Sequence, residues 1–90
     1  LSKRCYRALR AGAMPTLRIG GYKFRFYSSD RLEPPHVHVI RDNNVAKVWL
    51  RPVSLQYNRG YRLEELNAIL RLTREYQSQL LEAWYEYFSR

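Results

Sequence analysis

Two histidines, His36 and His38, stand one residue apart in the segment EPPHVHV (residues 33–39), and the chain has no others. On a strand, alternate side chains share a face, so the two imidazoles would lie about 6.6 Å apart on the same side. An imidazole titrates near neutral pH and can take or give a proton. RNA cleavage needs both steps, because one group removes the 2′-hydroxyl proton and another protonates the leaving oxygen. The pair therefore indicates acid-base phosphoryl transfer, with both histidines catalytic.

Two other interpretations of this pair remain open. Zinc takes three or four protein ligands, so the histidines would be half of a site that Glu33, Asp30 or Asp42 must complete. Alternatively, the histidines form a plain polar face of a strand whose opposite face carries Val37 and Val39. Because an isolated histidine pair lacks the further ligands, we expect no resident metal and no other cofactor.

Phosphoryl transfer also needs cations that neutralise the phosphate. Arg41, Lys47 and Arg59 are candidates by residue type, although the sequence does not place them beside the histidines. Basic and aromatic residues alternate in YKFRFY (22–27), a pattern that suits nucleic-acid binding but that any amphipathic strand also shows. We expect the three cations, together with Tyr57, to form a nucleic-acid-binding surface.

The second motif is LQYNRG (55–60). Asn58 and Gly60 tolerate positive φ, so a tight turn explains the motif by backbone needs alone. The same turn would hold Tyr57 and Arg59 outward at the start of the following helix. There Arg59 could clamp a phosphate through two hydrogen bonds while Tyr57 stacks on a base.

The elements that must position these side chains begin with strands. Apolar and polar residues alternate over 16–27, interrupted by Gly20 and Gly21, which suit a primed hairpin turn because both central positions need positive φ. Alternation returns over 36–50, where the turn residues DNN (42–44) divide two runs. The sequence therefore predicts an antiparallel sheet of two β-hairpins, followed by a short strand or an ordered loop.

One long C-terminal helix is predicted from about Arg62 to Phe88, where apolar residues recur at three- and four-residue steps. At the rise of an α-helix it would be about 40 Å long. Its last turns are apolar on more than one face, so the helix either bends around the core or binds a partner. We expect a partner interface, because Trp and Tyr are enriched at interfaces. This interface would consist of Leu80, Leu81, Trp84, Tyr85 and Phe88.

Composition limits the remaining possibilities. The 90 residues allow one small domain, and their net charge of +8 favours an anionic partner. Residues 1–13 contain four basic groups and no acid, and we expect them to be a disordered arm or an upstream extension. Residues 14–90 would form a single α+β domain. Cys5 is the only cysteine and no apolar run is long enough to span a membrane, so we expect a cytoplasmic protein without membrane contact.

Three stretches of the chain resemble one known family. They are MPTLRIGGYKFRFYSSDRLEPPHVHV, AKVWLRPVSLQYNRGY and EELNAILRLTREYQSQLLEAWYEYF. Together they are similar to the small bacterial family named domain of unknown function 4160, over residues 14–88, with EPPHVHV and YNRG as its hallmark motifs. The resemblance implies the toxin of a type II toxin-antitoxin module, which a cognate antitoxin encoded by the neighbouring gene inhibits. It implies no particular reaction.

These observations predict a toxin that acts on RNA, with His36 and His38 as acid and base and Arg59 as the phosphate clamp. The alternative is a non-enzymatic binding module that acts through a protein or nucleic-acid partner, with the histidines in structural roles. In either case, the apolar C-terminal turns would bind the antitoxin or a second copy of the chain.

Overall fold

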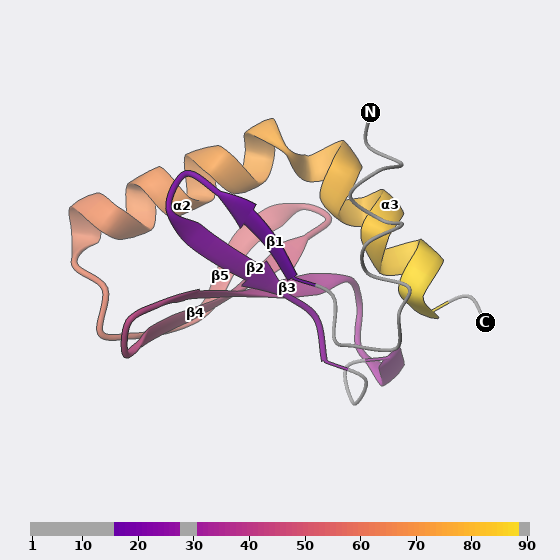
Figure 1. Cartoon of the computed structure of the whole chain (residues 1–90), viewed down its shortest axis with the longest axis horizontal. Coiled ribbons are helices and arrows are strands. Elements are labelled where there is room, and N and C mark those ends of the chain that lie inside the picture. Colours follow the sequence, from indigo (N-terminus) through magenta and orange to yellow (C-terminus); the bar gives the residue numbers. More distant parts are fainter. Residues whose placement is uncertain (1–15, 28–30, 89–90) are drawn as a thin grey trace.

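A computed structural model describes residues 16–27 and 31–88, and in it the chain folds as an α+β protein (Figure 1). A five-stranded antiparallel sheet follows the order of the sequence, β1-β2-β3-β4-β5. The strands are β1 (Thr16–Ile19), β2 (Tyr22–Arg25), β3 (His36–Arg41), β4 (Asn44–Leu50) and β5 (Val53–Arg59), and the helices are α2 (Leu63–Glu75) and α3 (Gln77–Phe88). The predicted α+β class is confirmed. The expected arm, residues 1–13, lies outside the described residues.

Both predicted hairpins are present. Gly20 and Gly21 have φ angles of 59° and 86°, which is the positive φ that a primed two-residue turn requires. The second turn joins β3 to β4 and includes Asp42, whose φ is 56°, a conformation that Asp tolerates better than most residues. The sheet thus begins as the alternation of the sequence predicts.

The prediction of only two hairpins was incomplete, because β5 adds a fifth strand beside β4. Opposite the β4 pair Lys47 and Val48, the register of β5 shifts, since Lys47 pairs with Tyr57 and Val48 with Leu55. Gln56 is therefore an extra residue, as in a β-bulge. The bulge interrupts the two-residue period of the segment, which explains why alternation alone left it as a strand or a loop.

The two faces of the sheet differ in what covers them. Figure 1 shows α2 and α3 arching over one face, which we call the core face. Its side chains include Leu17, Phe24, Val37, Val39, Ala46 and Val48, all buried. The opposite face, which we call the open face, carries the alternate residues of the strands. A hydrophobic core thus lies between the sheet and the two helices.

The single long helix predicted for the C-terminal region was wrong, because the helical region divides at Tyr76 into α2 and α3. The Thr73 hydroxyl donates to the Ile69 carbonyl oxygen over 2.7 Å, a contact that bends helices. Gln77 Nε2 donates to the Leu50 carbonyl oxygen over 2.6 Å and ties the bend to the end of β4. A straight helix of about 40 Å would exceed the longest dimension of the molecule, 36 Å.

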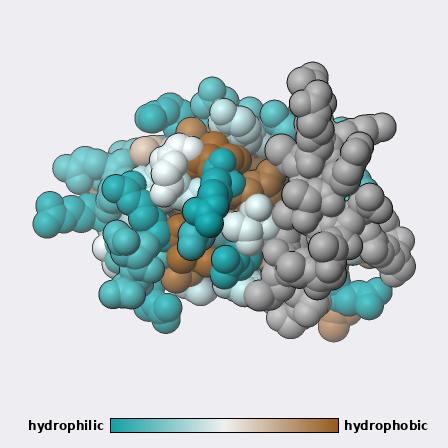
Figure 2. Space-filling model, viewed as in Figure 1, coloured by the Kyte–Doolittle hydropathy of each residue, from teal (hydrophilic) through white to brown (hydrophobic). Residues whose placement is uncertain are grey.

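The outer surface is largely polar in the view of Figure 2, where hydrophilic residues surround a smaller apolar area. Within the described residues, no helix combines the length and the apolar character needed to span a membrane. The largest fully buried side chains are Phe24, Phe26, Leu50, Ile69 and Leu80. Apolar burial is thus concentrated beneath the helices.

Candidate functional site

A row of four directly paired residues crosses the open face from β2 to β5. Arg25 pairs with His38, His38 with Lys47, and Lys47 with Tyr57. Neighbouring strands lie about 4.8 Å apart, so the side chains of this row stand next to one another. We call these four residues the histidine row.

The open face is basic and free of carboxylates in the described strands. One adjacent row crosses all five strands and begins with the pair Arg18 and Lys23 and ends with the pair Val45 and Arg59. The full set on this face is Thr16, Arg18, Lys23, Arg25, His36, His38, Ile40, Val45, Lys47, Trp49, Ser54, Tyr57 and Arg59. Five of these side chains are cations and none is acidic. Such a surface attracts polyanions.

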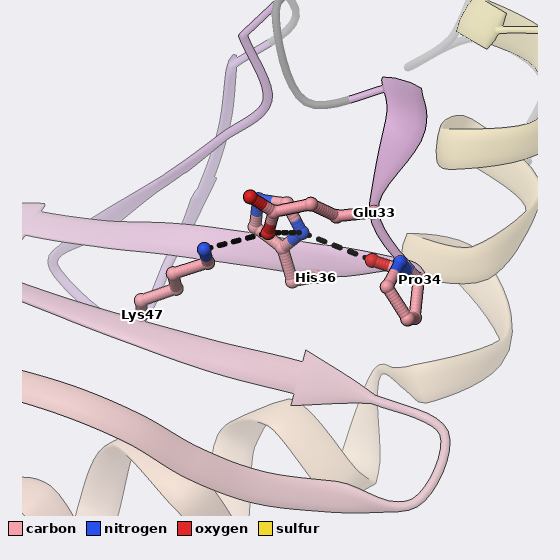
Figure 3. Close-up of polar contacts among 4 residues, drawn as sticks. All are labelled: Glu33, Pro34, His36 and Lys47. Carbon is pink, nitrogen blue, oxygen red and sulfur yellow. Dashed lines mark hydrogen bonds and ion pairs between the residues drawn. The ribbon is translucent and has the colours of Figure 1, made fainter.

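His36 is fully buried at the start of β3, with no exposed surface. Its Nδ1 atom lies 3.0 Å from the Pro34 carbonyl oxygen (Figure 3). A carbonyl only accepts hydrogen bonds, so Nδ1 is the donor and Nε2 is the atom of the neutral ring that can take a proton. Its ring also contacts those of Trp49 and Trp84, with centroid distances of 5.6 and 5.2 Å.

Glu33 joins His36 to Lys47. Lys47 Nζ donates to Glu33 Oε1 over 2.7 Å, and the same oxygen lies 3.7 Å from His36 Nδ1 (Figure 3). The Lys47 ammonium also lies 5.2 Å from the centre of the Trp49 ring, within the range of a cation–π contact. The segment before β3 therefore places one carboxylate at the edge of the open face, against a cation and an imidazole.

His38 is partly exposed, unlike its neighbour. The two imidazole centroids are 5.1 Å apart, which confirms that the strand holds both on one side. The Tyr27 ring packs edge-on against His38 at 4.6 Å. Arg25, its partner on β2, donates through Nε to the Thr16 hydroxyl over 3.0 Å. The pair thus combines one fully buried imidazole with one whose ring is partly exposed on the open face, and the Nε2 atoms of both rings are buried.

The four residues predicted to bind nucleic acid are only partly brought together. Lys47 and Tyr57 lie in the histidine row, and Tyr57 is 44% exposed. Arg59 is exposed on the same face but pairs with Val45, so it lies in the next row, two strands from β3. Arg41 belongs to the core face, where its guanidinium lies 5.1 Å from the centre of the Tyr22 ring. The structure therefore does not place Arg59 or Arg41 beside the histidines.

The YNRG motif has a clear structural role. The Asn58 side chain accepts a hydrogen bond from the Tyr61 backbone N–H over 3.1 Å and donates to the Tyr61 carbonyl oxygen over 3.0 Å. Gly60, with φ of 105°, lies against Asn44, and a Cβ at this position would collide with the Asn44 amide. Of the two residues expected to tolerate positive φ, only Gly60 adopts it. The motif therefore closes the connection between β5 and α2.

The two hydrogen bonds with the Asn58 side chain fix the backbone of Tyr61, whose side chain is buried in the core. Its hydroxyl donates to the Val39 carbonyl oxygen over 3.1 Å, and its ring packs edge-on against Tyr22. Burial raises the pKa of the Tyr61 hydroxyl from 10.0 to about 12, with smaller contributions from Tyr22 and Glu65. Tyr61 thus links the start of the helical layer to the centre of the sheet.

The residues predicted to form a partner interface occupy two environments. Leu80 and Trp84 are buried in the core, and Leu81 and Phe88 are partly buried against it. Tyr85 is 47% exposed, and its hydroxyl accepts a hydrogen bond from Arg51 Nη1 over 2.9 Å. The bend at Tyr76 lets α3 bury most of its apolar side chains within one chain. The association itself stays a prediction.

Metal ligation finds little support among the described residues. They include no group of three or more His, Cys, Asp or Glu side chains that could hold a metal ion. Glu33 faces Lys47 and the Nδ1 edge of His36. Asp42 lies in the turn at the far end of β3, and Asp30 lies outside the described residues.

Sequence reasoning missed three residues that the fold brings to the histidines, namely Arg25, Tyr27 and Trp49. Arg25 and Tyr27 occupy the alternate positions of YKFRFY that do not point into the core, a signal that the sequence does contain. Trp49 pairs directly with His36. That contact depends on the register between β3 and β4, which neither strand specifies alone.

One family model matches most of the chain. It is described as Domain of unknown function (DUF4160) and matches residues 21–85, which include all four residues of the histidine row, Glu33 and His36. No curated protein and no solved structure matches the chain.

Proposed function

The chain belongs to the DUF4160 family, whose description assigns no activity, and we propose from its site that it binds RNA on the open face of the sheet and cleaves it there. The observation that carries this proposal is the set of five cations on this face, whose strand residues include no acid, with His38 among them. An RNA backbone carries one negative charge per nucleotide, so a surface on which cations outnumber carboxylates favours its binding. An imidazole in the middle of that surface lies where a phosphate group would be held.

In the proposed reaction, His38 removes the proton from a 2′-hydroxyl, because it is the partly exposed member of the pair. The 2′-oxygen then attacks phosphorus, the bond to the 5′-oxygen breaks, and a 2′,3′-cyclic phosphate forms. His36, entering the reaction protonated on both ring nitrogens, would give its Nε2 proton to the leaving 5′-oxygen. Lys47 and Arg25, which flank His38 in the histidine row, would neutralise the phosphate. These two cations take the role that the sequence suggested for Arg59.

The biological setting we infer is a type II toxin-antitoxin module in which this chain is the toxin. The sequence resemblance supports this setting, and RNA cleavage would account for growth inhibition. The proposed partner is the antitoxin encoded by the neighbouring gene. An exposed part of α3 near Tyr85 would contribute to its binding site, since Tyr85 is the most exposed of the residues that we expected there.

A second candidate function is RNA binding without catalysis. The complete burial of His36 favours it, because a catalytic acid must reach the leaving oxygen. In this alternative His36 is a structural residue, held by Pro34 and by the rings of Trp49 and Trp84. Inhibition of growth would then follow from occupancy of the RNA.

Incubation of the purified protein with RNA, with and without a chelator, distinguishes the two candidates. We expect cleavage that survives the chelator and is lost in both His36→Gln and His38→Gln, while RNA binding is retained. Cleavage that persists in His38→Gln would contradict the proposed reaction. RNA binding without any cleavage by the wild type would favour the second candidate, and a protein that neither binds nor cleaves RNA would exclude both.

A further inference from the structure

Lys47 and Tyr57 are direct partners across β4 and β5, and both face the open side of the sheet. Lys47 is a cation beside His38, and Tyr57 exposes 44% of its surface on the edge strand. A cation and an exposed aromatic ring therefore lie side by side. Proteins that bind single-stranded nucleic acids combine these two features, because the cation tracks the backbone while the ring stacks on a base.

The bulge in β5 is what brings Tyr57 to this face. Val53 and Leu55 pair with Leu50 and Val48 on the core face, and simple alternation would place Tyr57 there as well. Because Gln56 is an extra residue, Tyr57 pairs instead with Lys47 on the open face. Bulges commonly re-aim side chains in this way near functional sites. The irregularity thus gives the histidine row its exposed aromatic residue.

We propose that the open face binds single-stranded RNA in preference to duplex, with a base stacked on Tyr57 and the adjoining phosphate held at Lys47 beside His38. This inference rests on the proposed function and names its substrate class. In a duplex, each base is stacked between its neighbours and paired, so its face is closed to a protein ring. An unpaired strand offers both its bases and its phosphates to one surface.

The test is equilibrium binding measured by fluorescence anisotropy. The probe is a labelled 2′-O-methyl RNA of about 12 nucleotides, whose blocked 2′-oxygen prevents cleavage, used alone and annealed to its complement. We expect the single strand to bind at least about tenfold more tightly than the duplex. Tyr57→Ala should lose about tenfold of single-strand affinity, whereas Tyr57→Phe, which keeps the ring, should stay close to wild type.

Leu55→Ala is the matched control, because Leu55 is 38% exposed on the same edge strand but faces the other side. It should leave single-strand affinity unchanged. Equal affinity for both probes, or wild-type binding by Tyr57→Ala, would overturn the inference. If cleavage of natural RNA still required His38 in that case, the proposed function would survive. If the wild type bound neither probe, both would fail.

Discussion

Glu33 Oε1 accepts a hydrogen bond of 2.7 Å from Lys47 Nζ, although 14 residues separate the two in the chain. The same oxygen lies 3.7 Å from His36 Nδ1. Carboxylate and phosphate oxygens accept hydrogen bonds from the same donors, so Glu33 occupies a position that would suit a phosphate oxygen of the proposed RNA ligand. The contact lies at the edge of the open face, where every other charged side chain of the described strands is basic.

Neutralising this carboxylate should strengthen RNA binding. We expect Glu33→Gln to raise affinity several-fold at low salt, because it removes a negative charge beside Lys47, and to lose this advantage as salt is added. The protein should stay about as stable as the wild type, since Glu33 is half-exposed and such ion pairs contribute about 1 kcal/mol or less. Anisotropy titrations at several salt concentrations would measure the effect.

Glu75→Gln is the control for this change, because it alters net charge equally at the exposed end of α2. It should have less effect on affinity than Glu33→Gln. Equal gains from both variants would show that only total charge matters, and a loss of affinity in Glu33→Gln would show that the carboxylate supports the site.

Tyr61 should make stability sensitive to alkaline pH. Its pKa is 10.0 in the unfolded chain and about 12 in the folded protein. Above pH 10 the unfolded chain loses this proton while the folded chain retains it. The stabilisation from Tyr61 is thus complete below pH 10 and is lost as pH rises through about 12. Urea denaturation across this range, with tyrosinate absorbance, would follow the loss.

Tyr61→Phe should remove this part of the pH dependence. At neutral pH it should also cost about 1 kcal/mol, because it deletes the hydrogen bond to the Val39 carbonyl oxygen. Tyr57→Phe is the matched control, since the Tyr57 side chain is exposed. An unchanged alkaline profile in Tyr61→Phe would show that other tyrosines govern it.

Gly60→Ala should destabilise the protein more than Gly21→Ala does. Both residues have positive φ, at 105° and 86°, so both variants incur the conformational cost of a side chain there, roughly 1 kcal/mol. A Cβ at Gly21 meets nothing within 4 Å, whereas one at Gly60 collides with Asn44. We expect at least about 1 kcal/mol more for Gly60→Ala, measured by urea denaturation. Equal losses would mean that the Asn44 side chain moves away freely.

Substitution of Trp84 should affect folding, whereas substitution of Tyr85 should affect only association with a partner. Trp84 is 4% exposed and contacts Phe26 and His36, so Trp84→Ala should cost about 3–5 kcal/mol and unfold much of the protein. Tyr85→Ala removes an exposed ring and should keep the wild-type unfolding curve within about 1 kcal/mol. We expect it to weaken binding to the neighbouring gene's product, or to a second copy, about tenfold.

Calorimetry and size-exclusion chromatography would measure this association. Leu63→Ala is the control, because Leu63 is 71% exposed but lies at the opposite end of the helical layer. Wild-type binding by Tyr85→Ala would place the interface elsewhere.

The parts of the fold that the sequence predicted depend on neighbouring residues. Gly20 and Gly21 specify their turn by backbone freedom, and alternation is enough to place His36 and His38 on one side of β3. Alternation also places Arg41 on the other face of β3, because it is an odd number of residues away from both histidines. Arg41 was nevertheless named as a candidate for the nucleic-acid-binding surface, because that prediction considered residue type and not the face of the strand.

The features that could not be predicted depend on contacts between distant segments. The bend at Tyr76 involves Gln77 and the carbonyl of Leu50, 27 residues away. The pairing of Trp49 with His36, and the extra residue Gln56, are properties of register between strands. Hydrophobic periodicity describes each segment by itself and does not indicate which residues of two neighbouring strands pair.

Separation of charge between the two layers gives the described part of the molecule an electric dipole. The helices α2 and α3 contain five glutamates against two arginines, whereas the open face of the described strands contains five cations and no acid. In the electric field of a polyanion such a molecule turns its basic sheet toward the polyanion. This orientation raises the fraction of collisions that lead to binding. The charge pattern would therefore raise the association rate before any residue of the site contacts the polyanion. This effect would depend strongly on ionic strength.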